Sequence, residues 1–265
     1  MRKRNNFLPI MLIIISSIAI VGTGLYIIVD KTSNLETPYY NGQNTTTADS
    51  TLNSTAPVTE ITAPSVINEK EKENPFDFTE LQEQNPDIYA WIYIPNTKVN
   101  YPVCKSNYSD NYYLDHDIYK NYSFSGAIYS QECNGRDFSD PVTVLYGHNM
   151  ADGSMFHHLH KFEDKDFFDK NRYIYVYTAD RKLTYEVVSA FIYDSRHIMN
   201  TFDFSKESDI KEYFDTVTNP RSLTQNVVDN YELTTSDKIL TLSTCVNYGR
   251  GRYLVQGALI KDEFI

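Results

Sequence analysis

The chain has 265 residues, of which 24 are Lys or Arg and 35 are Asp or Glu, so its formal net charge is −11. Residues 1–31 hold four of the basic and one of the acidic residues, which leaves 20 against 34, a net charge of −14, for the remainder. Such an acidic chain repels phosphate backbones, and the sequence has no basic stripe that would bind them. The composition therefore excludes a nucleic-acid partner. The length fits one folded domain with an attachment segment.

An apolar run of 23 residues, 7–29, stands near the N-terminus and is interrupted by small or neutral residues alone. A helix rises about 1.5 Å per residue, so this run would span a hydrocarbon core of roughly 30 Å. Three basic residues at positions 2–4 precede it, whereas Asp30 and Lys31 after it nearly cancel. This asymmetry predicts a cytoplasmic N-terminus and a chain that continues outside the cell. A cleaved signal peptide is the alternative, but its apolar region would be shorter, about 7–15 residues. We therefore expect residues 1–31 to be an uncleaved membrane anchor.

Residues 32–74 differ sharply from the rest in composition. They are rich in Asn, Thr and Ser and have no sustained hydrophobic periodicity. Such a segment cannot bury enough apolar surface to offset its ordering entropy. We expect an extracellular, disordered stalk that joins the anchor to a folded domain in residues 75–265.

The folded domain is predicted to be mainly β. A short helix is expected at 76–84, ended by the Asn85-Pro86-Asp87 turn. Short segments rich in Val, Ile, Tyr, Phe and Thr then follow, with turn residues between them. They lie at 90–94, 126–129, 142–146, 173–177, 183–193, 238–245 and 253–260, and helical insertions are expected at 154–170 and 206–217. This pattern favours a closed or nearly closed β-barrel with helices at its rim.

Cys245 ends the predicted strand 238–245. Side chains alternate along a strand, so Thr241, Ser243 and Cys245 share one face and Leu240 and Leu242 share the other. The thiol thus lies on a small, polar face at a strand end. This placement fits a nucleophile and an inert buried cysteine about equally well.

His148 follows the predicted strand 142–146, directly after Gly147. A histidine in this place can face a cleft, although an exposed loop histidine is the commoner case. A thiol is a weak nucleophile until it loses its proton, and a nearby imidazole can take that proton and later give it to a leaving amine.

Arg252 opens the strand that follows Cys245. A tight connection between two antiparallel strands would bring the guanidinium and the thiol together, where the guanidinium could stabilise an oxyanion with the help of a backbone N–H. Arg250 lies two residues earlier and shares the same strand parity, so the pattern leaves both arginines open.

These residues resemble the signature of sortases. Thr241-Leu242-Ser243-Thr244-Cys245, followed by an arginine that opens the next strand, is similar to the nucleophile motif of that family. Further segments resemble the class B branch of the family. They are Gly147-His148-Asn149-Met150, Asp152-Gly153-Ser154-Met155-Phe156, and the run from Trp91 to Thr97 with the segments at 101–103 and 112–114. The likeness covers residues 76–262. It implies an eight-stranded sortase barrel with an N-terminal helix and helical insertions, preceded by a transmembrane helix.

The resemblance also implies an activity. In a class B sortase, Cys245 would be the nucleophile, His148 the acid/base and Arg252 the arginine beside the oxyanion, while Ser243, Thr244 and Leu114 would line the substrate groove. The substrates would be exported proteins with a C-terminal sorting signal, and the acceptor an amino group of a peptidoglycan precursor. No metal or organic cofactor is implied. Six residues separate Cys245 from Arg252, fewer than expected for class B, so Arg250 remains the alternative for the arginine beside the oxyanion.

Other interpretations explain less of the sequence. His157 and His160 share one face of a helix at a spacing that two metal ligands could use, but no further ligand is arranged beside them. Cys104 and Cys133 could form a disulfide, which the sequence does not decide. A papain-like peptidase places its cysteine before its histidine, and an L,D-transpeptidase would need His and Gly next to the cysteine. A non-catalytic surface protein would explain the anchor but not the three residues at strand ends.

Overall fold

The computed structural model describes residues 74–246 and 251–265. They belong to a compact unit, Val66–Ile265. The predicted anchor, nearly all of the predicted stalk and Arg250 lie outside the described residues. Within these two ranges, no helix has the length and apolar character needed to cross a membrane.

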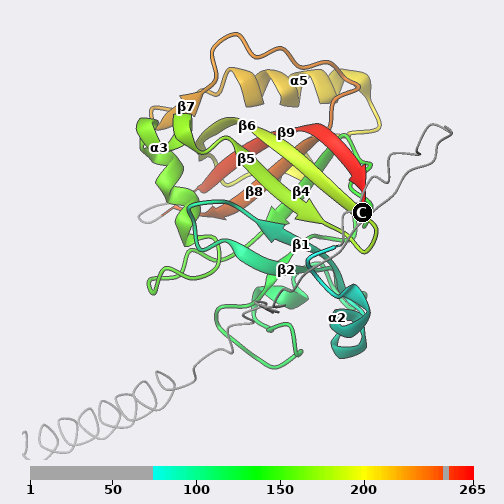
Figure 1. Cartoon of the computed structure of the whole chain (residues 1–265). Helices are drawn as coiled ribbons and strands as arrows, with labels where there is room; N and C mark the ends of the chain where they lie inside the picture. The colour runs from blue at the N-terminus through cyan, green and yellow to red at the C-terminus, as the bar shows by residue number, and fades with distance from the viewer. Residues whose placement is uncertain (1–73, 247–250) are drawn as a thin grey trace, which may run out of the picture. The chain divides into compact units, whose positions relative to one another are not determined.

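Eight of the described strands close into a barrel in the order β5-β1-β2-β3-β4-β8-β9-β6, because β5 pairs with both β1 and β6 (Figure 1). A further described strand, β7, extends the sheet from β6. The bounds are β1 Ile88–Tyr93, β2 Asn100–Cys104, β3 Ile128–Tyr129, β4 Val142–Tyr146, β5 Tyr173–Tyr177, β6 Arg181–Tyr193, β7 Gln225–Val227, β8 Ile239–Cys245 and β9 Arg252–Phe264. The predictions of a mainly β fold and an eight-stranded barrel are confirmed.

Strand β8 shows how the sequence builds the barrel wall. Leu240 and Leu242 are fully buried in the core cluster that also holds Tyr253 and Val255 of β9. The alternate residue Thr241 points the other way, because its hydroxyl lies 2.9 Å from the Tyr213 hydroxyl of helix α5. The alternation predicted for this strand is confirmed.

Helix α5 (Glu207–Thr218) covers the outer face of β6 and β9 (Figure 1). Its buried residues Ile210, Tyr213, Phe214 and Val217 recur at the spacing of one helical face. They pack in a second core cluster with side chains of β4, β6, β8 and β9. The helix predicted at 206–217 is therefore confirmed, and it supports β8 from outside.

The helix expected at 154–170 is wrong as a single element. The chain forms a 3₁₀ helix, η2 (His157–Glu163), and then a separate α-helix, α3 (Lys165–Lys170). Asp164 divides them because its carboxylate accepts a hydrogen bond from Phe167 N at 2.8 Å and caps the new helix. The remaining helices among residues 74–246 and 251–265 are α2 (Phe78–Gln84), η1 (Tyr112–Leu114) and α4 (Ile198–Thr201).

Candidate active site

Cys245 and Arg252 face each other across two neighbouring strands. Strand β8 ends at Cys245, β9 begins at Arg252, and these two residues are register partners in the antiparallel pair. Partners of this kind place their side chains on the same face of the sheet. The Arg252 Nη1 atom donates a hydrogen bond to Cys245 Sγ at 3.0 Å, and both side chains are exposed. The predicted closeness of the two residues is confirmed.

His148 reaches the same edge through a parallel pair. Strand β4 pairs in parallel with β8, and the last register partners are Tyr146 and Ser243. Gly147 N extends the pairing with a hydrogen bond to Ser243 O at 3.2 Å. His148 comes two residues after Tyr146 and Cys245 two residues after Ser243, so the parallel pair leads both residues to the same end of the sheet. Cys245 thus lies between the strand that leads to His148 and the strand that begins with Arg252.

The His148 ring is held by the loop that contains η1. Its Nε2 atom lies 2.8 Å from the Leu114 carbonyl oxygen, and its ring stacks on Phe124 with centroids 5.8 Å apart and planes at 21°. A carbonyl oxygen can accept but not donate, so Nε2 must carry a proton. On the main chain, His148 O accepts a hydrogen bond from Phe156 N at 2.9 Å. This arrangement leaves Nδ1 as the imidazole nitrogen that can exchange a proton.

Gly126 controls the position of the Leu114 carbonyl. It has a φ of +58°, and a Cβ atom there would lie 2.4 Å from Tyr113 O and 2.6 Å from Leu114 O. Gly126→Ala should therefore displace the carbonyl that accepts from His148. The left-handed backbone alone should cost about 1–2 kcal/mol of unfolding free energy. We expect a lower Tm in thermal melts and a lower rate of thiol-dependent turnover.

A second glycine provides the control for this variant. A Cβ atom on Gly135 would first meet the movable Asp137 carboxylate, at 2.8 Å. Gly135→Ala should therefore change stability less and leave turnover near that of the unsubstituted protein. Equal Tm and turnover for Gly126→Ala and the unsubstituted protein would contradict a need for this tight backbone approach.

Two tyrosines line the sheet beside these residues. The rings of Tyr129 and Tyr146 stack with centroids 5.5 Å apart. Burial raises the pKa of Tyr129 to about 12, although the Arg252 guanidinium opposes the shift. Burial likewise raises the pKa of Tyr146. Both phenols therefore remain protonated near neutral pH and add no charge beside Cys245.

All three cysteines are free thiols, so the possible disulfide between Cys104 and Cys133 is not formed. Cys104 is fully buried in β2, and burial strongly raises the pKa of its thiol. Partial burial also raises the pKa of the Cys133 thiol. Such shifts oppose formation of the reactive thiolate. Cys245 is the thiol that accepts a hydrogen bond from a guanidinium, at the end of the sheet to which β4 also leads His148.

The residues predicted to line a substrate groove differ in exposure. Leu114 is 42% exposed, whereas Ser243 is 3% exposed and Thr244 is fully buried. Thr244 alternates with Cys245 along β8, so its side chain lies on the opposite face of the strand. Burial removes the Thr244 side chain from the surface that a peptide could reach, and Leu114 remains accessible.

His157 and His160 take hydrogen-bond partners near Cys245. His157 Nδ1 lies 2.7 Å from Asn149 Oδ1, and His160 Nε2 lies 3.0 Å from the Cys245 carbonyl oxygen. Asn149 Nδ2 donates to the same carbonyl at 3.1 Å. Across residues 74–246 and 251–265, no three His, Cys, Asp or Glu side chains are grouped to hold a metal ion. Asn149 was quoted from the sequence only as part of the Gly147-His148-Asn149-Met150 motif, without a role of its own.

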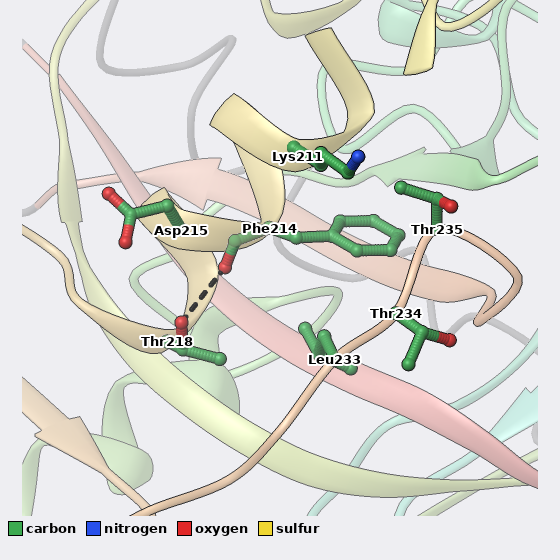
Figure 2. A pocket seen from close by; sticks show the side chains of 7 residues that line it. All are labelled: Lys211, Phe214, Asp215, Thr218, Leu233, Thr234 and Thr235. Carbon is green, nitrogen blue, oxygen red and sulfur yellow. Dashed lines mark hydrogen bonds between the residues drawn. The ribbon is translucent and has the colours of Figure 1, made fainter. Parts of the chain in front are cut away.

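A cavity elsewhere in the described fold has no such chemistry. It measures about 250 Å³ and is lined by α5 and the segment before β8 (Figure 2). Its lining residues are Lys211, Phe214, Asp215, Thr218, Leu233, Thr234 and Thr235. It contains no thiol or imidazole, so we place the reactive centre at Cys245.

The family model of the sortase domain matches residues 92–260, which include β4, β8 and most of β9. This chain belongs to the sortase family. Sortase B of Listeria monocytogenes is 33% identical over 193 residues, 69% of this chain and 74% of the relative. Sortase B of Staphylococcus aureus is 28% identical over 168 residues, 63% of this chain and 67% of the relative.

Solved sortase structures share the fold. Sortase B of Clostridium perfringens superposes with a TM-score of 0.62 at 29% identity, covering 69% of this sortase and 99% of that chain. Sortase B of Bacillus anthracis gives a TM-score of 0.61 at 32% identity, and the match covers 69% of this chain and 84% of that chain. The class B resemblance is therefore confirmed, and the chain is a sortase B-type cysteine transpeptidase.

Proposed function

We propose that this sortase cleaves a C-terminal sorting signal of exported proteins through a thioester on Cys245 and transfers them to an amino group of a peptidoglycan precursor. The supporting observation is the 3.0 Å contact between Arg252 Nη1 and Cys245 Sγ, beside β4, the parallel neighbour of β8 that leads to His148. Family membership supports the reaction class. A solved Staphylococcus aureus sortase B is a complex with a substrate, and it matches this chain with a TM-score of 0.61 at 27% identity.

In the first step, the Cys245 thiol passes its proton to His148, and the resulting thiolate sulfur attacks a backbone carbonyl carbon of the sorting signal. A carbon–sulfur bond forms, and the carbonyl oxygen becomes an oxyanion that the Arg252 guanidinium and a backbone N–H near Cys245 stabilise. The carbon–nitrogen bond then breaks, and His148 gives a proton to the departing amine. Because the Leu114 carbonyl holds the Nε2 proton, Nδ1 is the nitrogen that passes this proton.

In the second step, the amino group of the acceptor attacks the thioester carbon. His148 takes a proton from that amine, the carbon–sulfur bond breaks, and the sulfur is released as thiolate. A new amide bond joins the exported protein to the acceptor. Attack by water would instead give hydrolysis. The side chains named here and the two substrates supply every atom and proton that this acyl transfer requires.

A peptide library tests the proposed reaction. The full-length chain in detergent should be incubated with peptides that vary in the sorting-signal segment, with and without a soluble peptide that has a free amino terminus. We expect a covalent mass increase on Cys245 equal to the amino-terminal part of the cleaved peptide. With the amine present, a ligated product should form. If no library peptide acylates the enzyme, the proposed substrate class is wrong.

The predicted anchor implies a testable topology. We expect residues 1–31 to be retained in the mature protein and the catalytic domain to lie outside the cell. Protease added to cells stripped of their wall should then release a soluble fragment that begins within residues 32–74. A domain that resists external protease in intact stripped cells but is digested after lysis, or a mature N-terminus beyond Lys31, would contradict this topology.

A further inference from the structure

The main-chain carbonyl of Cys245 is held by two side chains from outside its own strand. Asn149 Nδ2 lies 3.1 Å from this oxygen and His160 Nε2 lies 3.0 Å from it, while the two nitrogens are 3.1 Å apart. Asn149 belongs to the loop after β4, and His160 belongs to η2. Side chains from two separate segments therefore contact the same backbone oxygen atom of Cys245.

The contacts fix how Asn149 is oriented. A carbonyl oxygen can accept but not donate, so the amide nitrogen must face Cys245 and the amide oxygen must face His157. The distance from His157 Nδ1 to Asn149 Oδ1 is 2.7 Å, which requires the proton on Nδ1. Asn149 directly follows His148, so this side chain ties the His148 loop to the end of β8.

His160 is held on both sides of its ring. Its Nδ1 atom lies 2.5 Å from Glu163 Oε1 and its Nε2 atom faces the Cys245 carbonyl, and because both oxygens can only accept, the ring carries a proton on each nitrogen and pairs with Glu163 as an imidazolium. The ring stacks on Tyr253, the residue after Arg252, with centroids 4.8 Å apart and planes at 22°. Its side chain is 11% exposed. A ring held in this way keeps Nε2 aimed at the Cys245 carbonyl.

Fixing this carbonyl also fixes a neighbouring donor. The peptide unit between Cys245 and Val246 is planar, and no described peptide bond is cis, so the Val246 N–H points opposite to the Cys245 carbonyl. That N–H is the first backbone donor after the nucleophile. A donor to a developing oxyanion is effective when its direction is set before the reaction.

We propose that Asn149 and His160 are positioning residues that hold the Cys245–Val246 peptide unit, so that the Val246 N–H is aimed at the oxyanion formed during acylation. The proposal rests on the proposed acyl transfer at Cys245. Neither residue touches the reacting atoms. Their effect passes through the peptide plane, which separates this role from that of Arg252.

The test compares two reactions of the same thiol. Acylation by a cleavable peptide forms an oxyanion, whereas alkylation by iodoacetamide substitutes at a saturated carbon and forms none. The variants are Asn149→Ala, His160→Phe, which keeps a ring over Tyr253, and the double substitution in the full-length chain. His160→Gln retains an N–H near the place of Nε2 and serves as the conservative variant.

Each single substitution should lower the single-turnover acylation rate at saturating peptide by about tenfold, and the double substitution by about 10²-fold, because loss of a whole oxyanion donor costs about 10²–10³. The iodoacetamide rate and the KM for peptide should stay within about twofold of the unsubstituted protein. His160→Gln should recover most of the acylation rate.

His158→Phe is the matched control. His158 lies in the same 3₁₀ helix, but its Nδ1 atom accepts from Lys98 N at 2.9 Å, away from Cys245. This variant should acylate at the normal rate. Acylation within twofold of normal in the double variant would overturn the inference, as would a parallel loss of acylation and alkylation. If the unsubstituted protein forms no acyl-enzyme while iodoacetamide still labels Cys245, the proposed function fails instead.

Discussion

Cys245→Ala should abolish acyl-enzyme formation, with a loss of turnover on the order of 10⁶-fold, as expected when a nucleophile is removed. The side chain is exposed at the end of β8, so its truncation leaves no cavity in the core and should not change the Tm. Intact mass spectrometry after incubation with a cleavable peptide measures the adduct directly. The unsubstituted chain should carry one adduct, located on Cys245.

Cys133→Ala is the control, because Cys133 is also a free, exposed thiol. Partial burial and the nearby Asp110 carboxylate raise the pKa of the Cys133 thiol, which keeps it protonated near neutral pH. We expect Cys133→Ala to form the adduct at the normal rate. Turnover retained in Cys245→Ala, with an adduct on Cys133, would contradict the assignment of the nucleophile.

Local sequence pattern was sufficient for most of the barrel strands. Strands β4 and β5 have the predicted bounds, Val142–Tyr146 and Tyr173–Tyr177, because their Val, Ile and Tyr runs are flanked by turn residues. Strand β2 (Asn100–Cys104) was not predicted as a strand, since Pro102 interrupts a short run. Strand β7 (Gln225–Val227) has three residues and no pattern of its own.

The candidate site was predictable residue by residue, but its assembly was only partly so. The closeness of Cys245 and Arg252 follows from the order of two antiparallel strands, and their register pairing confirms it. The parallel pairing of β4 with β8 joins strands separated by about a hundred residues. Such non-local pairing has no local signal, so the sequence placed His148 at a strand end without showing that the end lies beside Cys245.

The contacts of Asn149 and His160 were even less predictable from the sequence than the position of His148. Their hydrogen bonds reach a backbone carbonyl 96 and 85 residues away along the chain. Every residue has a backbone carbonyl, so no residue type or spacing in the sequence indicates which carbonyl these side chains will contact. The spacing of His157 and His160 suggested a metal site or a solvated face, whereas the fold directs both rings towards Asn149 and the Cys245 backbone.

Arg252→Ala should lower kcat by about 10²–10³, roughly 2.7–4 kcal/mol of transition-state stabilisation, with a smaller change in KM. The physical reason is its place at the start of β9, where pairing with Cys245 sets the direction of the guanidinium and puts Nη1 3.0 Å from the sulfur. Arg252→Lys should recover little activity, because an ammonium lacks the planar fork of donors. Steady-state kinetics with a cleavable peptide measure both values.

Arg250→Ala is the decisive comparison, because the two arginines flank Gly251 and share strand parity. Arg250 lies outside the described residues, so the kinetics must separate the two. In sequence, Arg250 stands between two glycines, whose backbone freedom disfavours a precise aim. We expect Arg250→Ala to change kcat by a few-fold at most. If that variant loses kcat by about 10²-fold or more while Arg252→Ala is nearly normal, the oxyanion is stabilised by Arg250, and the contact of Arg252 with the sulfur has no catalytic role.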